Sequence, residues 1–226
     1  MKMRAVFFFL LAVFLLAFTN DNPFFRISKQ DVELKIPKGF PKPLYDFKNN
    51  PLSPEIFILG RKLFYDPILS KDSNISCGTC HKQAAVFSDA PLALSRGISG
   101  LTGTRNAPAL QNLIWNTSFM WDGGVNHLEV QPISPITNHV EMDETMASVI
   151  RKLHRSSTYR ESFSTAFGDT VISSERMLKA LAQFIGLMIS ANSRYDHFVN
   201  HKGTFTTAEE KGLQIFRDKC ANCCAE

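Results

Sequence analysis

Cysteine is scarce in this sequence of 226 residues, and its five cysteines are unevenly placed. Four of them form two C-x-x-C pairs, Cys77 with Cys80 and Cys220 with Cys223, and only Cys224 lies outside the pairs. Small secreted domains that rely on disulfides use a larger share of cysteine along the whole chain. A disulfide framework is therefore the weaker interpretation of these cysteines.

The sequence also lacks any cluster of Lys and Arg that resembles a nucleic-acid-binding surface, and its formal net charge is a mild +4. We therefore expect no nucleic-acid partner. The alternation of apolar and polar residues that is typical of strands is absent as well. With 44% hydrophobic and 20% charged residues, the composition is that of a globular protein with a real core. These features predict a mainly α fold.

Cys77-Gly78-Thr79-Cys80-His81 is the C-x-x-C-H motif of covalent c-type haem attachment. Two thiols three positions apart can form thioethers with both vinyl groups of one haem. His81 then follows where an imidazole can ligate the iron. A zinc site or a redox pair also uses C-x-x-C, but zinc needs four ligands and a redox pair needs no following histidine. We therefore expect one haem c, held by Cys77, Cys80 and His81.

Cys220-Ala221-Asn222-Cys223-Cys224 nearly repeats this motif, but a cysteine stands where the ligand histidine should be. A second haem attached to Cys220 and Cys223 would lack its histidine, so this motif is predicted to be defective. Only two residues follow it, so we expect a chain truncated at the start of a second haem domain. A real product, a truncated gene and a reading error all fit this pattern.

The N-terminus has the features of an export signal. Lys2 and Arg4 precede an unbroken apolar run of 14 residues, from Ala5 to Phe18. A membrane-spanning helix needs about 20 apolar residues, so the run is short for one. Residues 1–20 are predicted as a signal peptide or an N-terminal anchor. Export would place the chain in the periplasm or elsewhere outside the cytoplasm, where c-type haem is attached.

The rest of the chain is predicted to form three parts. Residues 21–50 lack periodicity and form an extended leading segment. Residues 51–200 form a first cytochrome c-like haem domain with its connecting helices, and residues 201–226 begin a second one. Helices are expected from Ser53-Pro54 to Asp66-Pro67, over 144–153, over 159–167, over 174–198, and from a Thr207-x-x-Glu210 capping box to Cys220. The long stretch from Phe87 to Met142 has little periodicity and is expected to wrap the haem in an ordered way.

A haem with one fixed histidine can carry electrons or catalyse a reaction, depending on the groups at its other face. Glu141, Gln131 and Pro135 are candidates for that face. A carboxylate over an open haem can move a proton between the two oxygens of a bound peroxide. From the residues alone, a solvated loop carboxylate or a helix N-cap is the more usual interpretation of Glu141.

The chain resembles the bacterial di-haem cytochrome c peroxidases and the related MauG proteins from about Leu52 to its C-terminus. The resemblance is carried, in order, by Leu59-Gly60-Arg61-Lys62-Leu63-Phe64-Tyr65-Asp66-Pro67, Ser76 to His81, Phe87-Ser88-Asp89, Arg105-Asn106-Ala107-Pro108, Trp121-Asp122-Gly123, Gln131, Pro135 and Val140-Glu141-Met142. It implies a cytochrome c-like fold and the reduction of hydrogen peroxide. The electrons would come from a small periplasmic protein, either a cytochrome c or a cupredoxin.

The resemblance also implies roles for single residues. His81 matches the proximal ligand of the peroxidatic haem, and Glu141 matches the acid/base residue, with Gln131 and Pro135 as its distal companions. Trp121 matches a tryptophan that lies between the two haems and relays electrons.

Asn106 matches a residue that binds calcium between the domains, where a hard cation prefers oxygen ligands. The resemblance also admits a homodimer.

Two further positions depart from the family pattern. Many members carry a histidine in the loop after the first haem that blocks the iron until the second haem is reduced. This chain has Gly97-Ile98-Ser99 there and no histidine between His81 and His127. Gly124 stands where an arginine usually follows Trp-Asp-Gly. Surface or supporting roles are expected for the remaining histidines, His127, His139, His154, His197 and His201.

Two other functions remain open at this stage. A MauG-like enzyme would oxidise residues of a partner protein through long-range electron transfer, and it shares the first haem motif. A non-enzymatic chain would be an electron-transfer cytochrome or an inactive remnant of a truncated gene.

Overall fold

The computed structural model describes residues 32–221. Within this range the chain forms helices and irregular loops, with isolated β-bridges and no strand. The predicted mainly α fold is therefore confirmed. No helix in the same range is long and apolar enough to cross a membrane. The export signal predicted for residues 1–20 lies outside the described residues, as do Cys223 and Cys224.

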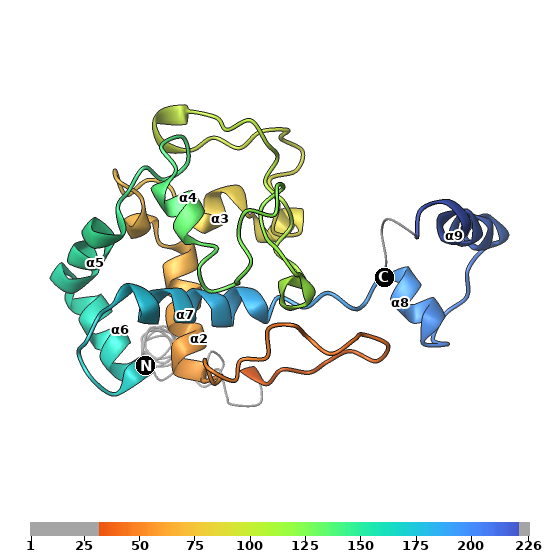
Figure 1. Ribbon diagram of the computed structural model, residues 1–226, viewed down its shortest axis with the longest axis horizontal. Coiled ribbons are helices and arrows are strands. Elements are labelled where there is room, and N and C mark those ends of the chain that lie inside the picture. The colour runs from red at the N-terminus through yellow and green to blue at the C-terminus, as the bar shows by residue number, and fades with distance from the viewer. Residues whose placement is uncertain (1–31, 222–226) are drawn as a thin grey trace, which may run out of the picture.

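The helices α2 (Pro54–Tyr65) and α7 (Ser174–Gly186) cross at the centre of the molecule (Figure 1). α2 begins as predicted, because the Ser53 hydroxyl accepts a hydrogen bond from the Ile56 amide at 3.1 Å and Pro54 occupies the first turn. Gly60 permits the close approach of the two helices. A Cβ atom at this position would lie 1.9 Å from the carbonyl oxygen of Ala180, so any larger residue would push the helices apart.

The helices α5 (Met146–Arg155) and α6 (Ser157–Phe167) pack against each other, and α6 also packs against α2. The two predictions for these helices are confirmed to within a few residues. α5 begins at Met146 because the Thr145 hydroxyl accepts a hydrogen bond from the Ser148 amide at 3.2 Å. α6 ends at Gly168, which adopts a left-handed conformation with φ of 80°. Their inner faces supply fully buried residues to the core, namely Val149, Leu153 and Phe163.

The prediction of one helix over residues 174–198 is wrong. α7 ends at Gly186, and a separate short helix, α8 (Arg194–Val199), follows after an irregular segment. The chain leaves the helix because Asn112 binds that segment: its side-chain nitrogen donates to the Ser190 carbonyl at 2.9 Å, and its side-chain oxygen accepts from the Ser190 amide at 2.8 Å. Met188 and Ile189 are consequently half-buried outside the helix and pack against the core.

The last helix, α9 (Thr207–Lys219), begins one residue earlier than predicted. Its capping box uses Thr206 and Glu209, not Thr207 and Glu210: the Glu209 carboxylate accepts from the Thr206 amide at 2.8 Å. Cys220 follows as its C-cap and is exposed. α8 and α9 lie apart from the other helices, joined to them by a single stretch of chain (Figure 1). The domain limits drawn from the sequence remain predictions.

Residues 66–145 form a loop-rich layer over one side of α2 and α7 (Figure 1). The layer contains two very short helices, α3 (Cys77–Cys80) and α4 (Ile133–Thr137). Isolated β-bridges close three of its loops, over residues 82–88, 96–102 and 119–125. The layer is therefore fixed by hydrogen bonds, as the prediction of an ordered stretch requires.

Candidate active site

The predicted haem-attachment motif lies on α3, a single helical turn. Its turn is closed by Ser76 and Thr79, since the Ser76 amide donates to the Thr79 hydroxyl at 3.1 Å. Residues three apart on a helix face the same side, so Cys77 and Cys80 both lie on one face of the turn. The His81 amide donates to the Cys77 carbonyl at 2.9 Å and continues the turn to the third residue of the motif. The local fold thus presents two thiols and one imidazole together.

His81 is held in the form that a haem iron requires. Its Nδ1 lies 3.0 Å from the carbonyl oxygen of Phe87, which can only accept a hydrogen bond, so Nδ1 donates and the Nε2 lone pair is left for a metal. The loop over residues 82–88 turns back to place this carbonyl, and Phe87 adopts a left-handed conformation with φ of 54°. Burial lowers the pKa of His81, while the hydrogen bond to the Phe87 carbonyl opposes the effect. The neutral imidazole is therefore favoured.

The two thiols and their surroundings also fit a covalently bound haem. Burial raises the pKa of Cys77 to about 12 and raises that of Cys80, so both are held as neutral thiols. Beside Cys80, the hydroxyl of Ser95 is buried close to the Cys80 thiol and the Asp89 carboxylate. Two thiols and one imidazole on a single turn are the groups that covalent haem attachment requires.

Glu141 lies in a tight turn between α4 and α5. The Asn138 carbonyl accepts from the amides of Glu141 at 3.0 Å and Asp143 at 2.9 Å, which closes the turn. The next residue, Met142, is buried in the core, and its carbonyl accepts from the Lys71 amide at 3.0 Å. Hydrogen bonds thus hold the backbone on both sides of Glu141, which restricts the orientation of its side chain.

The Glu141 carboxyl group is partly buried. Burial raises its pKa, and a hydrogen bond from Asn138 partly opposes that rise. The group lies close enough to Cys80 that its charge contributes to the raised pKa of that thiol. Glu141 and the attachment turn, 60 positions apart in the sequence, therefore face the same region. The acid/base role that the resemblance implies for Glu141 stays a prediction.

Gln131 and Pro135 lie on the segment that leads to Glu141. Pro135 is within α4 and is half-buried. The side-chain nitrogen of Gln131 donates to the Met120 sulfur at 3.5 Å, while the hydrogen-bond partner of the Glu141 side chain is Asn138. Their roles as distal companions of Glu141 stay predictions.

Trp121 and Asn106 are in direct contact. The Trp121 indole nitrogen donates to the Asn106 backbone carbonyl at 2.6 Å, and the Trp121 side chain is 63% exposed. The Asn106 side-chain nitrogen donates to the carbonyls of Leu92 and Ala93, both at 3.3 Å. Within residues 32–221, no group of three or more His, Cys, Asp or Glu side chains is arranged to hold a metal ion. The calcium role of Asn106 stays a prediction.

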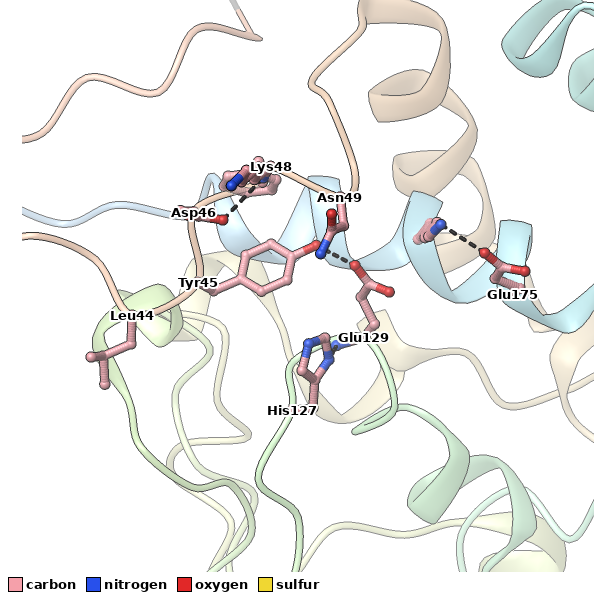
Figure 2. A pocket seen from close by; sticks show the side chains of 10 residues that line it. Leu44, Tyr45, Asp46, Lys48, Asn49, His127, Glu129 and Glu175 are labelled. Carbon is pink, nitrogen blue, oxygen red and sulfur yellow. Dashed lines mark hydrogen bonds and ion pairs between the residues drawn. The ribbon is translucent and has the colours of Figure 1, made fainter.

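A hollow of about 320 Å³ lies elsewhere on the surface and contains none of the predicted site residues. Figure 2 shows the Tyr45 hydroxyl pointing at Glu129, with a hydrogen bond of 2.6 Å, and His127 on the same side. Burial, with the hydrogen bond to Glu129, raises the pKa of Tyr45. Lys179 and Glu175 form an ion pair at the rim.

Two features of the site had no clear signal in the sequence. Asn138 is the hydrogen-bond partner of Glu141, and Gly97 lies directly against the Glu141 backbone. The only hint was the position of an asparagine three residues before the glutamate, a spacing at which asparagine often closes a turn. The remaining cysteine of the second motif in the described range, Cys220, lies on the separate α9 side of the molecule (Figure 1).

A mainly α fold with a C-x-x-C-H turn and a partly buried carboxylate near it is typical of c-type haem proteins with a cytochrome c-like fold. Residues 54–204 match the family described as di-haem cytochrome c peroxidase. The chain belongs to this family.

The relatives agree with this assignment. The methylamine utilization protein MauG of Methylophilus methylotrophus is 35% identical over 195 residues, which cover 85% of this chain and 57% of that protein. The cytochrome c551 peroxidase of Pseudomonas aeruginosa is 30% identical over 191 residues, covering 83% of this chain and 55% of that protein. The crystal structure of a MauG-like protein associated with microbial copper homeostasis matches with a TM-score of 0.76 and 30% identity, covering 84% of this chain and 57% of that one. The chain thus spans little more than half the length of these relatives.

Proposed function

We propose that this protein is an exported c-type haem peroxidase that reduces hydrogen peroxide to water. The observation that carries the proposal is the position of Glu141, a partly buried carboxyl group that faces the haem-attachment turn from a rigid backbone. Burial moves the pKa of Glu141 upward, toward neutral pH. A residue that takes up and returns a proton works best when its pKa lies near the operating pH.

The proposed reaction consumes one hydrogen peroxide, two protons and two electrons and yields two waters. Haem bound through Cys77, Cys80 and His81 supplies the iron that binds peroxide and accepts the electrons of the donor. Glu141 takes the proton from one peroxide oxygen and delivers it to the other, which leaves as water. Burial raises the pKa of Glu141, which makes its carboxylate a stronger base for the first proton wherever the group is ionised.

The electrons would come from a small periplasmic protein, either a cytochrome c or a cupredoxin. Trp121 is a suitable relay because its ring is largely exposed while its indole nitrogen is fixed on Asn106. Large apolar side chains are exposed along the same loops, and they offer a surface for a second domain or a partner: Val86, Leu92, Leu94, Leu101 and Met120. A calcium ion at Asn106 and a homodimer are parts of this proposal, as is export through residues 1–20.

A direct test is turnover of the haem-loaded protein with hydrogen peroxide and reduced donor. Oxidation of a reduced cytochrome c or cupredoxin, followed by its absorbance, should depend on peroxide and on the attached haem. The matched control is the Cys77→Ala/Cys80→Ala protein, which keeps the chain but removes both attachment points. Equal turnover by the two proteins would contradict the proposal.

A MauG-type oxidation of a partner protein is the second candidate, and the 35% identity to a protein of that name favours it. The same exposed Trp121 would then pass electrons from the partner instead of from a donor cytochrome. The two functions differ in what is consumed. Peroxide-dependent change in a co-purifying protein, without oxidation of reduced cytochrome, would favour the MauG-type activity.

A further inference from the structure

We propose that Asn138 is a positioning residue that selects which oxygen of Glu141 exchanges the proton with peroxide. This inference rests on the proposed function. It assigns a role to Asn138 and identifies the oxygen atom of Glu141 that exchanges the proton. Asn138 is not expected to touch peroxide. It acts through the carboxylate that it holds.

The contact is short and its direction is determined by the turn. The Asn138 side-chain nitrogen Nδ2 donates to Glu141 Oε1 at 2.7 Å. Asn138 Oδ1 accepts a hydrogen bond from the Val140 amide at 3.1 Å. Because a backbone amide can only donate, Oδ1 must face Val140, and Nδ2 must then face Glu141. The orientation of the Asn138 side-chain amide is therefore determined by the Val140 backbone amide.

Asn138 is itself held firmly. Its amide donates to the Ser134 carbonyl at 3.0 Å, and its carbonyl accepts from two amides of the turn, as described above. The residue ends α4, so the rigid part of the chain that precedes it also fixes its side chain. Holding a reacting group in one orientation can be worth as much as 10²-fold in rate when it prevents a displacement of about 1 Å.

As a consequence, the two carboxylate oxygens of Glu141 have different roles. Oε1 is engaged by Asn138, and Oε2 is left to exchange the proton. When Oε2 takes a proton from one peroxide oxygen, the bond from Asn138 to Oε1 persists. The new O–H on Oε2 can then donate to the other peroxide oxygen. The two electrons of the reduction still come from the donor protein.

The charges around Glu141 make Asn138 the main group that stabilises its ionised form. From α3, the side chain that faces Glu141 is Cys80, whose sulfur carries no charge either as a neutral thiol or as the thioether of the haem-loaded protein. The loop over residues 97–101 and the helix α4 contain no ionisable residue. In the turn itself, His139 is exposed and Asp143 is paired with Lys71 at 2.6 Å. Burial raises the pKa of Glu141, and the hydrogen bond from Asn138 is the effect that lowers it.

Two substitutions separate a positioning role from a structural one. Asn138→Asp keeps an oxygen that accepts from the Val140 amide, so the turn is retained, but it replaces the donor to Glu141 with a second carboxylate. Asn138→Ala removes both contacts. If the Asn138 side chain only closes the turn and does not hold the Glu141 carboxylate, Glu141 should titrate in both variants as it does in the unmodified protein. If it positions Glu141, both variants should raise the pKa of Glu141, and the Asp variant should do so most, because two carboxylates in contact repel each other.

The matched control is Asn112→Ala. Asn112 makes the same pair of side-chain contacts, one donated and one accepted, to the backbone of Ser190. It lies outside the site, so its loss should lower stability without changing the behaviour of Glu141. Comparison with this control removes effects that come from weaker folding alone.

The first measurement is the infrared absorption of the protonated Glu141 carboxyl group against pH, in haem-loaded protein without peroxide. Glu141→Gln identifies the band by removing it. We expect the midpoint of the band to move to higher pH in both Asn138 variants and to stay unchanged in Asn112→Ala. An unchanged midpoint in Asn138→Asp would overturn the inference, whether or not the protein proves to be a peroxidase.

The second measurement is the rate constant for reaction with hydrogen peroxide across pH, followed by the haem absorbance in stopped flow. Glu141 must be ionised to accept the first proton, so the rate falls at low pH and a higher pKa moves this fall to higher pH. We expect Asn138→Ala to react on the order of 10-fold more slowly near neutrality. Unmodified protein that does not react would contradict the proposed function. Variants with the same pH profile as a reactive unmodified protein would contradict only the role of Asn138.

Discussion

The amide of Ile98 donates a hydrogen bond to the carbonyl of Glu141 at 2.8 Å. This bond joins the loop after the haem-attachment turn to the turn that carries the proposed acid/base residue. The preceding Gly97 is buried against the same backbone: a Cβ atom there would lie 2.2 Å from the Val140 carbonyl oxygen and 2.6 Å from the Glu141 Cα. In this chain, the loop that holds a removable histidine in many family members is thus bound to the proposed catalytic segment.

Gly97→Ala should therefore separate the loop from the Glu141 turn. The added methyl group meets backbone atoms, which cannot rotate away, so overpacking should lower the free energy of unfolding by about 1–3 kcal/mol. The reaction with peroxide should slow at the same time, because the Glu141 backbone must shift. Gly103→Ala is the matched control, since a Cβ at that position meets nothing within 4 Å. The free energy of unfolding in denaturant and the rate of reaction with peroxide are measured for both variants. Equal values for Gly97→Ala and Gly103→Ala would show that the contact of Gly97 with the Glu141 turn has no effect.

The haem should be high-spin in the ferric protein as isolated, with an open distal face and no requirement for prior reduction. The loop over residues 97–101 has no histidine to offer the iron, and its bridge between Arg96 and Thr102 and its bond to Glu141 keep it in place. Electron paramagnetic resonance is the measurement. A spectrum dominated by low-spin signals from two histidine ligands would contradict this expectation.

The chain should carry one covalently bound haem, attached through Cys77 and Cys80. The second motif has Cys224 in place of the ligand histidine, so it should attach haem weakly. The haem content, measured as pyridine haemochrome, should be about one per chain. It should be lost in Cys77→Ala/Cys80→Ala and kept in Cys220→Ala. Two well-ligated haems per chain would be inconsistent with the prediction.

Local signals in the sequence were sufficient for the ends of several helices and for the haem-attachment turn. Ser53 and Pro54 start α2, and Gly168 ends α6, because caps depend on residues within a few positions. The end of α7 was not predictable in this way. It depends on Asn112, which contacts Ser190 from 78 positions away in the sequence.

In the candidate active site, too, local features were predictable from the sequence and long-range contacts were not. The three residues of the attachment motif lie in one turn, so their chemistry follows from their spacing. The contact of Glu141 with Asn138 lies within one tight turn, yet no local pattern distinguishes it from a contact with Gln131. The approach of Gly97 to Glu141 joins segments 44 positions apart and depends on the packing of both loops. Such contacts are decided by tertiary structure.

Glu141→Gln tests the central claim most directly. Glutamine keeps the size of the side chain and can hydrogen-bond, but it cannot carry a proton. The matched control is Glu129→Gln. The Glu129 carboxylate accepts a hydrogen bond of 2.6 Å from the Tyr45 hydroxyl, and it does not belong to the haem-attachment site. The measurement is the stopped-flow rate constant for the reaction of each haem-loaded protein with hydrogen peroxide. The account predicts a fall of about 10²–10⁴-fold for Glu141→Gln and none for Glu129→Gln. An unchanged rate for Glu141→Gln, at full haem content, would contradict the account.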